Sequence, residues 1–308
     1  MYLISLRGIW GSVLSVLLVV LFSFSLFLSE NMVFFWLFLE LIGLSLIPSF
    51  FYLYGGVSFV TLFIYIVVSS VSSVLMLFGV LDSNLMFFFV LGFLVKFGVF
   101  PFMGWVYCVI LGSNYVVVWL FSTFLKFPFV YICFFLSGLG DFSYSAVFLF
   151  CLVTFLFLSV WFWVSSYSWR CCWCHMMISS SVALVLMSVK GSMDLLFWFF
   201  LAYFFWSSLT IFYLYQIDSF GFSLNNSSLA SLRCPGLLYW FGFIFFLLTT
   251  PISFALLYKV VMVFCVYALE FYTIFFWVVY SLSEQFFFFK YAASSYISKL
   301  SFSWFFLV

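Results

Sequence analysis

Four ionisable side chains lie deep within long apolar stretches of the sequence: Glu40, Lys96, Lys126 and Lys259. A charge at the centre of a membrane helix costs roughly 2.5–3.5 kcal/mol on insertion scales. Membrane proteins keep such residues mainly where they form pathways for protons, ions or charged substrates. Because carboxylates and amines exchange protons, this set predicts a proton pathway.

The four charges do not balance one another. A lysine buried alone in hydrocarbon favours its neutral form, whereas a nearby carboxylate holds it charged. Glu40 is the natural partner of Lys96, and one such pair could simply lock two helices together. That alternative does not account for the set, because three lysines share one deep acid. The remaining lysines need another anion or must titrate, and a row of titrating lysines is a proton wire.

Three of the five prolines lie close to these lysines. Pro101 follows Lys96, Pro128 follows Lys126, and Pro251 precedes Lys259. Proline has no backbone N–H, so within a helix it leaves the carbonyl four residues earlier unpaired. The carbonyls concerned belong to Phe97, Phe124 and Leu247. Broken backbone at membrane depth is tolerated only where it is buried in protein or lines a wet cavity, so the prolines favour a polar channel.

The composition excludes an ordinary soluble domain. Of 308 residues, 69% are hydrophobic and 6% are charged, whereas soluble domains are about half apolar and a quarter charged. A net charge of +1 provides no basic surface for nucleic acid. We therefore predict an all-α, polytopic membrane helix bundle whose outward face meets lipid.

About 20 apolar residues cross a bilayer core of ~30 Å, and on this measure the chain has ten spanning segments. They are residues 8–29, 32–54, 57–81, 84–111, 113–138, 142–167, 173–191, 194–217, 237–267 and 271–293. The first is long enough to be a retained helix rather than a cleavable signal. Residues 294–308 could form an eleventh helix, a stub of one or an interfacial piece. The polar stretch 218–235 is expected to be a loop outside the bilayer.

The order of the segments predicts an internal repeat and an orientation. Lys96 and Lys259 lie five segments apart, which suits inverted halves at about 8–138 and 142–293 of a single transmembrane domain. With ten crossings, four basic residues fall on one side and Lys190 on the other; the four are Arg7, Arg170, Arg233 and Lys299. The positive-inside rule then places the N-terminus on the side of synthesis, although nine basic residues could scatter this way by chance.

Two further signals carry less weight. The run from Cys171 to His175 holds three cysteines and the sole histidine, but ligands within five residues of one helix point around its circumference. We predict no metal there. His175 could join the proton path from a helix edge, or be an interfacial residue with no role. Glu284 could balance Lys290 or face the interior, and we favour a packing role for it.

Four stretches resemble mitochondrial NADH–ubiquinone oxidoreductase chain 2. Residues 36–41 followed by Ile47-Pro48 resemble its W-x-x-L-E…I-P segment, and residues 96–106 resemble its K-x-G-x-x-P-F-x-x-W-V signature. Residues 122–128 are similar to its K-x-P helix, and residues 251–259 to the proline-to-lysine spacing of its late broken helix. The order and approximate spacing hold from about residue 30 to 260.

The resemblance implies an antiporter-like membrane-arm subunit of respiratory complex I in the mitochondrial inner membrane, with its N-terminus on the matrix side. It implies that Glu40 is the pair acid, Lys96 its switching partner, Lys126 the central relay and Lys259 the terminal residue. Other membrane-arm subunits and inner-membrane lipids would be its partners. NADH, FMN, Fe–S clusters and ubiquinone would be bound by other subunits, and no cofactor by this chain.

The chain also departs from that family's pattern. The departures are Met103 in place of His, Tyr107-Cys108 in place of Pro-Glu, Thr249-Thr250 in place of two Gly, and His175 in place of Tyr after Arg170. They leave the four charges intact but place accessory polar contacts in doubt. A stand-alone cation/proton antiporter, a structural spacer subunit and a longer antiporter-like chain of the same complex remain alternatives.

Overall fold

The computed structural model describes residues 2–29, 31–52, 59–82, 85–128, 141–190, 192–219, 234–267, 269 and 271–305. Within these residues every regular element is a helix, which confirms the predicted all-α class. The α-helices are α1 (Tyr2–Leu26), α2 (Met32–Ser45), α3 (Phe59–Leu81), α4 (Met86–Phe97), α5 (Gly104–Gly112), α6 (Tyr115–Ser122), α8 (Asp141–Ser165), α9 (Trp169–Lys190), α10 (Met193–Ser219), α11 (Cys234–Gly242), α12 (Phe254–Tyr267) and α13 (Phe271–Phe305). Short 3₁₀ helices η1 (Ile47–Phe51) and η3 (Phe124–Lys126) and a π-helical turn η5 (Phe243–Leu247) extend three of them.

Six helical stretches are long and apolar enough to cross a membrane, in agreement with a polytopic membrane protein. They are Gly8–Leu26, Met32–Phe51, Phe59–Leu81, Ser145–Ser165, Trp169–Ser188 and Asp194–Ser219. Helix α13 runs unbroken for 35 residues, so residues 294–305 prolong the tenth predicted segment and form no separate eleventh helix. The end of the fifth predicted segment (129–138) and most of the predicted polar loop (220–233) lie outside the described residues.

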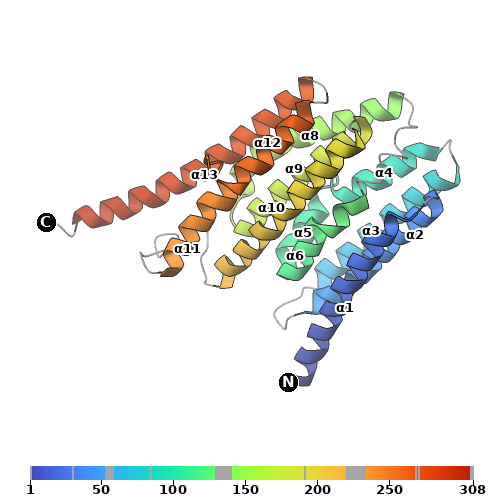
Figure 1. The fold of residues 1–308 in the computed structure, drawn as a ribbon, viewed down its shortest axis with the longest axis horizontal. Coiled ribbons are helices and arrows are strands. Elements are labelled where there is room, and N and C mark those ends of the chain that lie inside the picture. The colour runs from blue at the N-terminus through green and yellow to red at the C-terminus, as the bar shows by residue number, and fades with distance from the viewer. Residues whose placement is uncertain are drawn as a thin grey trace.

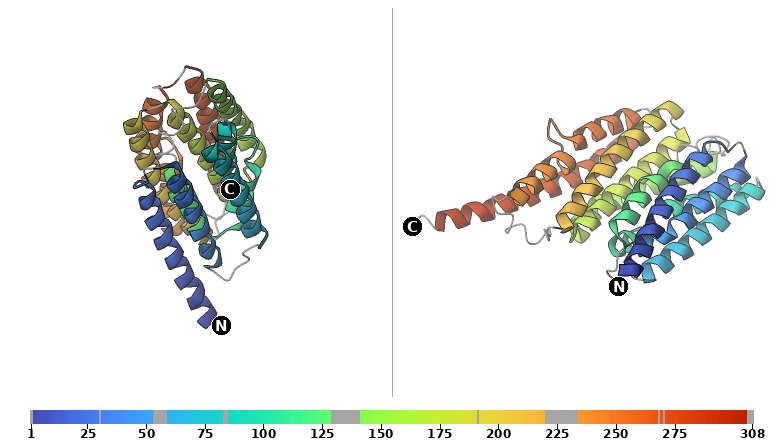
Figure 2. Two further views of the ribbon diagram at one scale, coloured as in Figure 1. Left: turned by 90° about the vertical axis from the view of Figure 1, so that its right-hand side faces the viewer. Right: turned by 60° about the horizontal axis from the view of Figure 1, so that its bottom comes forward.

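The helices lie side by side, with α1, α2 and α3 at one side of the bundle and α12 and α13 at the other (Figure 1). The right-hand view of Figure 2 shows the same succession of inclined helices. Helix α9 packs against α5, α8, α10 and α12, and its apolar window is completely buried within the protein. It is therefore the central helix of the bundle. The predicted inverted halves remain a prediction.

The outward surface is apolar, as contact with lipid requires. Large side chains such as Leu28 (82% exposed) and Ile252 (86%) project from it. Soluble monomers rarely expose such contiguous apolar area. Charged contacts gather instead at a helix end, where Arg170 on α9 pairs with Asp218 on α10 at 3.3 Å and donates to the Ser113 carbonyl at 2.7 Å.

Three of the predicted spanning segments are interrupted helices. Helix α4 ends at Phe97, and Gly98 follows with φ +66°, in the left-handed region that favours glycine. The indole N–H of Trp105 on α5 donates back to the Val95 carbonyl at 2.9 Å, closing the break. Lys96 therefore lies in the last turn of α4, not at the centre of a continuous helix as predicted.

The other two interruptions adjoin the other two lysines. The fifth segment leaves α-helical geometry at Thr123, so Lys126 ends the 3₁₀ turn η3. The ninth segment breaks between Leu247 and Phe254, and Lys259 lies in the second turn of α12. Each buried lysine is thus close to a helix break.

The α4–α5 break makes a sharp prediction for Gly98→Ala. A left-handed non-glycine residue costs about 1–2 kcal/mol, and the added Cβ would lie 2.3 Å from a methyl carbon of Val106. We expect a lower midpoint of thermal unfolding for the purified protein in detergent. The matched control is Gly104→Ala, where a Cβ meets no atom within 4 Å; equal midpoints for both variants would contradict this account of the break.

Candidate functional site

Lys126 is the most completely enclosed of the predicted relay residues, with 2% of its surface exposed. Its ammonium group donates to the Met177 carbonyl at 2.9 Å, the Ser180 hydroxyl at 2.7 Å and the Tyr203 hydroxyl at 2.9 Å. It also lies 4.2 Å from the centre of the Tyr203 ring. Among the described residues, no carboxylate lies within ion-pair distance of it. Its three donors are satisfied by neutral groups, so it can hold or release a proton without breaking a salt bridge.

Lys96 and Lys126 line the same small cavity, together with Ser181 of α9. The cavity is close to the volume that one water molecule needs, and the rest of its lining is apolar: Phe97, Phe121, Leu125 and Met177. The sequence places these lysines thirty residues apart on different segments. The fold brings them to one small cavity.

Glu40 and Lys96, predicted to pair, are not in contact. The carboxylate oxygen Oε2 of Glu40 and the Nζ of Lys96 are both buried, and neither has a hydrogen-bond partner among the described residues. Glu40 nevertheless lies close enough for its charge to act on Lys96. The structure therefore holds this pair in an open arrangement, and the expectation of direct contact was wrong for this state.

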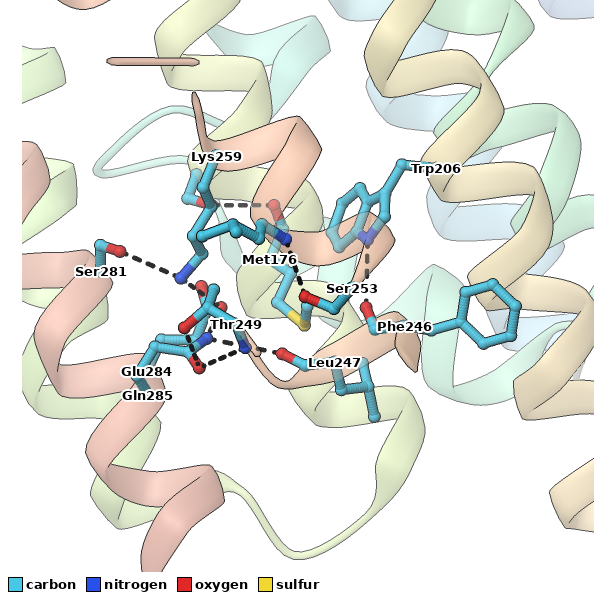
Figure 3. A network of polar contacts seen from close by, with 12 residues as sticks. Met176, Trp206, Phe246, Leu247, Thr249, Ser253, Lys259, Ser281, Glu284 and Gln285 are labelled. Carbon is cyan, nitrogen blue, oxygen red and sulfur yellow. Dashed lines mark hydrogen bonds and ion pairs between the residues drawn. The ribbon is translucent and has the colours of Figure 1, made fainter. Parts of the chain in front are cut away.

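Lys259 makes the direct ion pair that Lys96 lacks. Its Nζ lies 3.0 Å from Oε1 of Glu284 on α13 and donates to the Ser281 hydroxyl at 3.0 Å (Figure 3). The Glu284 side chain is 5% exposed and that of Lys259 is 14% exposed. Glu284 therefore faces the interior, as one of the two positions weighed from the sequence has it, and it does not balance Lys290. Its partner is Lys259, and the bundle holds a second deep acid that sequence reasoning did not assign.

A second cavity surrounds this ion pair and is large enough for a water molecule. It is lined by Lys259 and Glu284, by Tyr258 and Tyr280, and by Ser179 of α9. The three consecutive serines of α9 thus divide between the sites: Ser179 faces this cavity, while Ser180 and Ser181 face Lys126 and its cavity. The run Ser179-Ser180-Ser181 within an otherwise apolar segment was the sequence signal that could have indicated that α9 contributes to both cavities.

The break beside Lys259 is stabilised by side chains of neighbouring helices. The Leu247 carbonyl, which Pro251 was predicted to leave unpaired, accepts from the Gln285 amide at 3.5 Å. The Phe246 carbonyl accepts from the Trp206 indole at 3.1 Å (Figure 3). The corresponding prediction for Pro128 was wrong, because the Phe127 N–H bonds to the Phe124 carbonyl within the tightened turn.

The accessory residues are placed differently from one another. Pro128 is buried beside Lys126, whereas Pro101 and Pro251 are exposed in the two other breaks. His175, in the second turn of α9, is fully buried within the protein, and its part in the proton path remains a prediction. Its Nδ1 lies 2.6 Å from the Tyr107 hydroxyl, which means that two departures from the chain 2 pattern contact each other. Within the described part of the chain, no three potential metal ligands converge.

The fold resembles that of a respiratory membrane protein. A chain in the structure of the membrane-bound sulfane sulfur reductase, an archaeal respiratory membrane complex, superposes with a TM-score of 0.66 at 14% sequence identity. The match covers 84% of this chain and 61% of that one, so this chain spans about three-fifths of its neighbour's length. No family model matches the sequence, and no characterised protein matches it by sequence. The likeness establishes a shared membrane fold.

The Lys126 contacts predict the effect of Tyr203→Phe. The change removes one of three acceptors from a buried amine, and a hydrogen bond to a charged group is worth about 1.5–3 kcal/mol. We expect a lower thermal midpoint in detergent. Tyr215→Phe is the control, because Tyr215 is 48% exposed and should leave the midpoint nearly unchanged. An unchanged midpoint for Tyr203→Phe would show that the hydroxyl does not hold Lys126.

Proposed function

We propose that this chain is the chain 2 type, antiporter-like membrane-arm subunit of NADH–ubiquinone oxidoreductase, and that it relays protons across the mitochondrial inner membrane. The observation that carries this function is the buried polar line through the bundle. The line runs from Glu40 and Lys96, through a shared cavity, to Lys126, and beyond α9 to Lys259 with Glu284. The chain 2 motifs and the fold of a respiratory membrane complex subunit support the same function.

In this mechanism the chain moves protons and other subunits move electrons. A proton on Lys96 passes through the shared cavity to Lys126, whose neutral partners accept the amine in either protonation state. Hydroxyl groups of Ser180 and Tyr203 can then reorient and pass the proton toward the cavity around Lys259. A change in the Glu40–Lys96 pair would drive each transfer electrostatically. NADH, FMN, Fe–S clusters and ubiquinone would be handled by partner subunits.

The second deep acid gives one observation in favour of a stand-alone cation/proton exchanger, since such a protein needs an ion-binding carboxylate beyond Glu40. Glu284 could serve, but its charge is already matched by Lys259 at 3.0 Å. Sodium–proton exchange by the purified chain alone in vesicles would favour the exchanger. Absence of exchange would favour the complex I subunit.

The relay predicts that Lys126→Ala lowers proton translocation. In the intact complex, reconstituted in liposomes, we expect fewer protons moved per NADH oxidised, because the central amine is gone. A pH-sensitive dye inside the vesicles measures the ratio. Lys290→Ala is the matched control, as Lys290 is exposed on α13 and lies outside the polar line. Wild-type pumping by Lys126→Ala would favour a structural spacer.

In the proposed mechanism the charge of Glu40 acts on Lys96 and drives proton transfer. We therefore expect Glu40→Gln to lower the proton-to-electron ratio as well. The amide keeps the size of the side chain but cannot hold the charge that acts on Lys96. The same liposome assay measures the effect. Normal pumping by Glu40→Gln would exclude this acid from the mechanism.

Membership in the complex makes a separate prediction about assembly. On a blue-native gel of mitochondrial membranes, this chain should migrate with the band that oxidises NADH and reduces ubiquinone. Mass spectrometry of the band identifies the chain. Its migration only at the mass of a monomer would contradict the assignment to complex I.

A further inference from the structure

The two lysine–carboxylate pairs are in opposite states. Lys259 and Glu284 are in contact at 3.0 Å, whereas Glu40 and Lys96 each have a buried polar atom without a hydrogen-bond partner in the described chain. Two static ion pairs that serve only to lock helices would both be expected to be closed, because an unpaired buried charge is costly. The asymmetry points to pairs that open.

We infer that Glu284 is a proton-exchanging residue at the far end of the relay, and that it exchanges its proton with Lys259. This role rests on the proposed function and adds an acid to it. In the exchange, an N–H bond of the Lys259 ammonium breaks and an O–H bond forms on the Glu284 carboxylate. Both side chains become neutral, and the proton remains within the cavity that they line.

Each member of the pair has a second polar partner, which a switching pair needs and a simple lock does not. Lys259 also donates to the Ser281 hydroxyl at 3.0 Å. Glu284 also accepts from the Gln285 amide at 3.1 Å, and the hydroxyl-bearing Tyr280 lines the same cavity. When the pair opens, neither group is left without a hydrogen bond.

Gln285 connects the pair to the helix break. Its side-chain oxygen accepts from the Thr249 backbone N–H at 3.1 Å and from the Thr249 hydroxyl at 3.0 Å, and its amide reaches the Leu247 carbonyl at 3.5 Å (Figure 3). The same amide donates to Glu284. A change of charge on Glu284 therefore acts directly on the interrupted backbone between η5 and α12.

Lys126 lies between the two pairs and has no carboxylate among its described contacts. Like charges repel more strongly where the effective dielectric constant is low. A proton arriving on Lys126 therefore disfavours a charge on Lys259 and favours its transfer to Glu284. The same positive charge on Lys126 disfavours a second one on Lys96, with which it shares a cavity. The central lysine thus acts on both outer lysines in the same sense and favours the neutral form of each.

The test is Glu284→Gln in the intact complex in liposomes, with proton-to-electron ratio and native-gel assembly measured together. We expect an assembled complex whose ratio falls as far as in Lys126→Ala, and substantial recovery in Glu284→Asp, which restores a carboxyl group. Asp194→Asn is the control, because it removes an acid from the exposed first turn of α10 and should leave the ratio unchanged. A normal ratio in Glu284→Gln overturns the inference.

A second variant tests the inference if the complex with Glu284→Gln fails to assemble. In Lys259→Gln/Glu284→Gln both charges are removed and hydrogen bonding is kept, so a purely structural pair should assemble and pump normally. Assembly with a lowered ratio supports proton exchange by the pair, and a wild-type ratio overturns it. The proposed function is tested separately. Normal pumping by Lys126→Ala would contradict the proposed proton relay, whereas normal pumping by Glu284→Gln alone would contradict only the role inferred for Glu284.

Discussion

The structure depends on the absence of water from the bilayer core. Taking an ion out of water costs several kcal/mol even after the protein relaxes, so a buried amine is stable when it finds its partners inside the bundle. Lys126 meets three oxygen acceptors, and Lys259 meets a carboxylate and a hydroxyl, whereas the Lys96 amine has no partner among the described residues. The Leu247 carbonyl at a helix break meets the Gln285 amide. The helix breaks are thus stabilised by side chains of neighbouring helices rather than by the lysines beside them.

Helix α9 is the element that makes this possible. It is surrounded by protein on every side, so its serines need not face lipid. Small hydroxyl side chains let neighbouring helices approach closely and also provide hydrogen bonds. Ser179 and Ser180 turn toward different lysines, which places one helix between two polar cavities. An apolar α9 would remove the serine hydroxyls that line both cavities and bond Lys126.

The two lysine–carboxylate pairs differ in state. One lysine is held by a carboxylate in contact, while the other is released from its own. The fold is shared with a chain of an archaeal respiratory membrane complex at only 14% identity, so helix packing persists while most side chains change. The contact between Tyr107 and His175 illustrates such change, because both residues depart from the chain 2 pattern and the fold places them together.

The sequence by itself determined the helical class and the polytopic membrane character of the chain, because hydrophobic length is a local property. Proline spacing also indicated interrupted segments, although not that Lys96 would end a helix. Only the tertiary structure decided which groups meet. The pairing of Lys259 with Glu284, the open state of Glu40 with Lys96 and the burial of His175 depend on how distant helices pack, and helical periodicity within one segment carries no information about the neighbour that it faces.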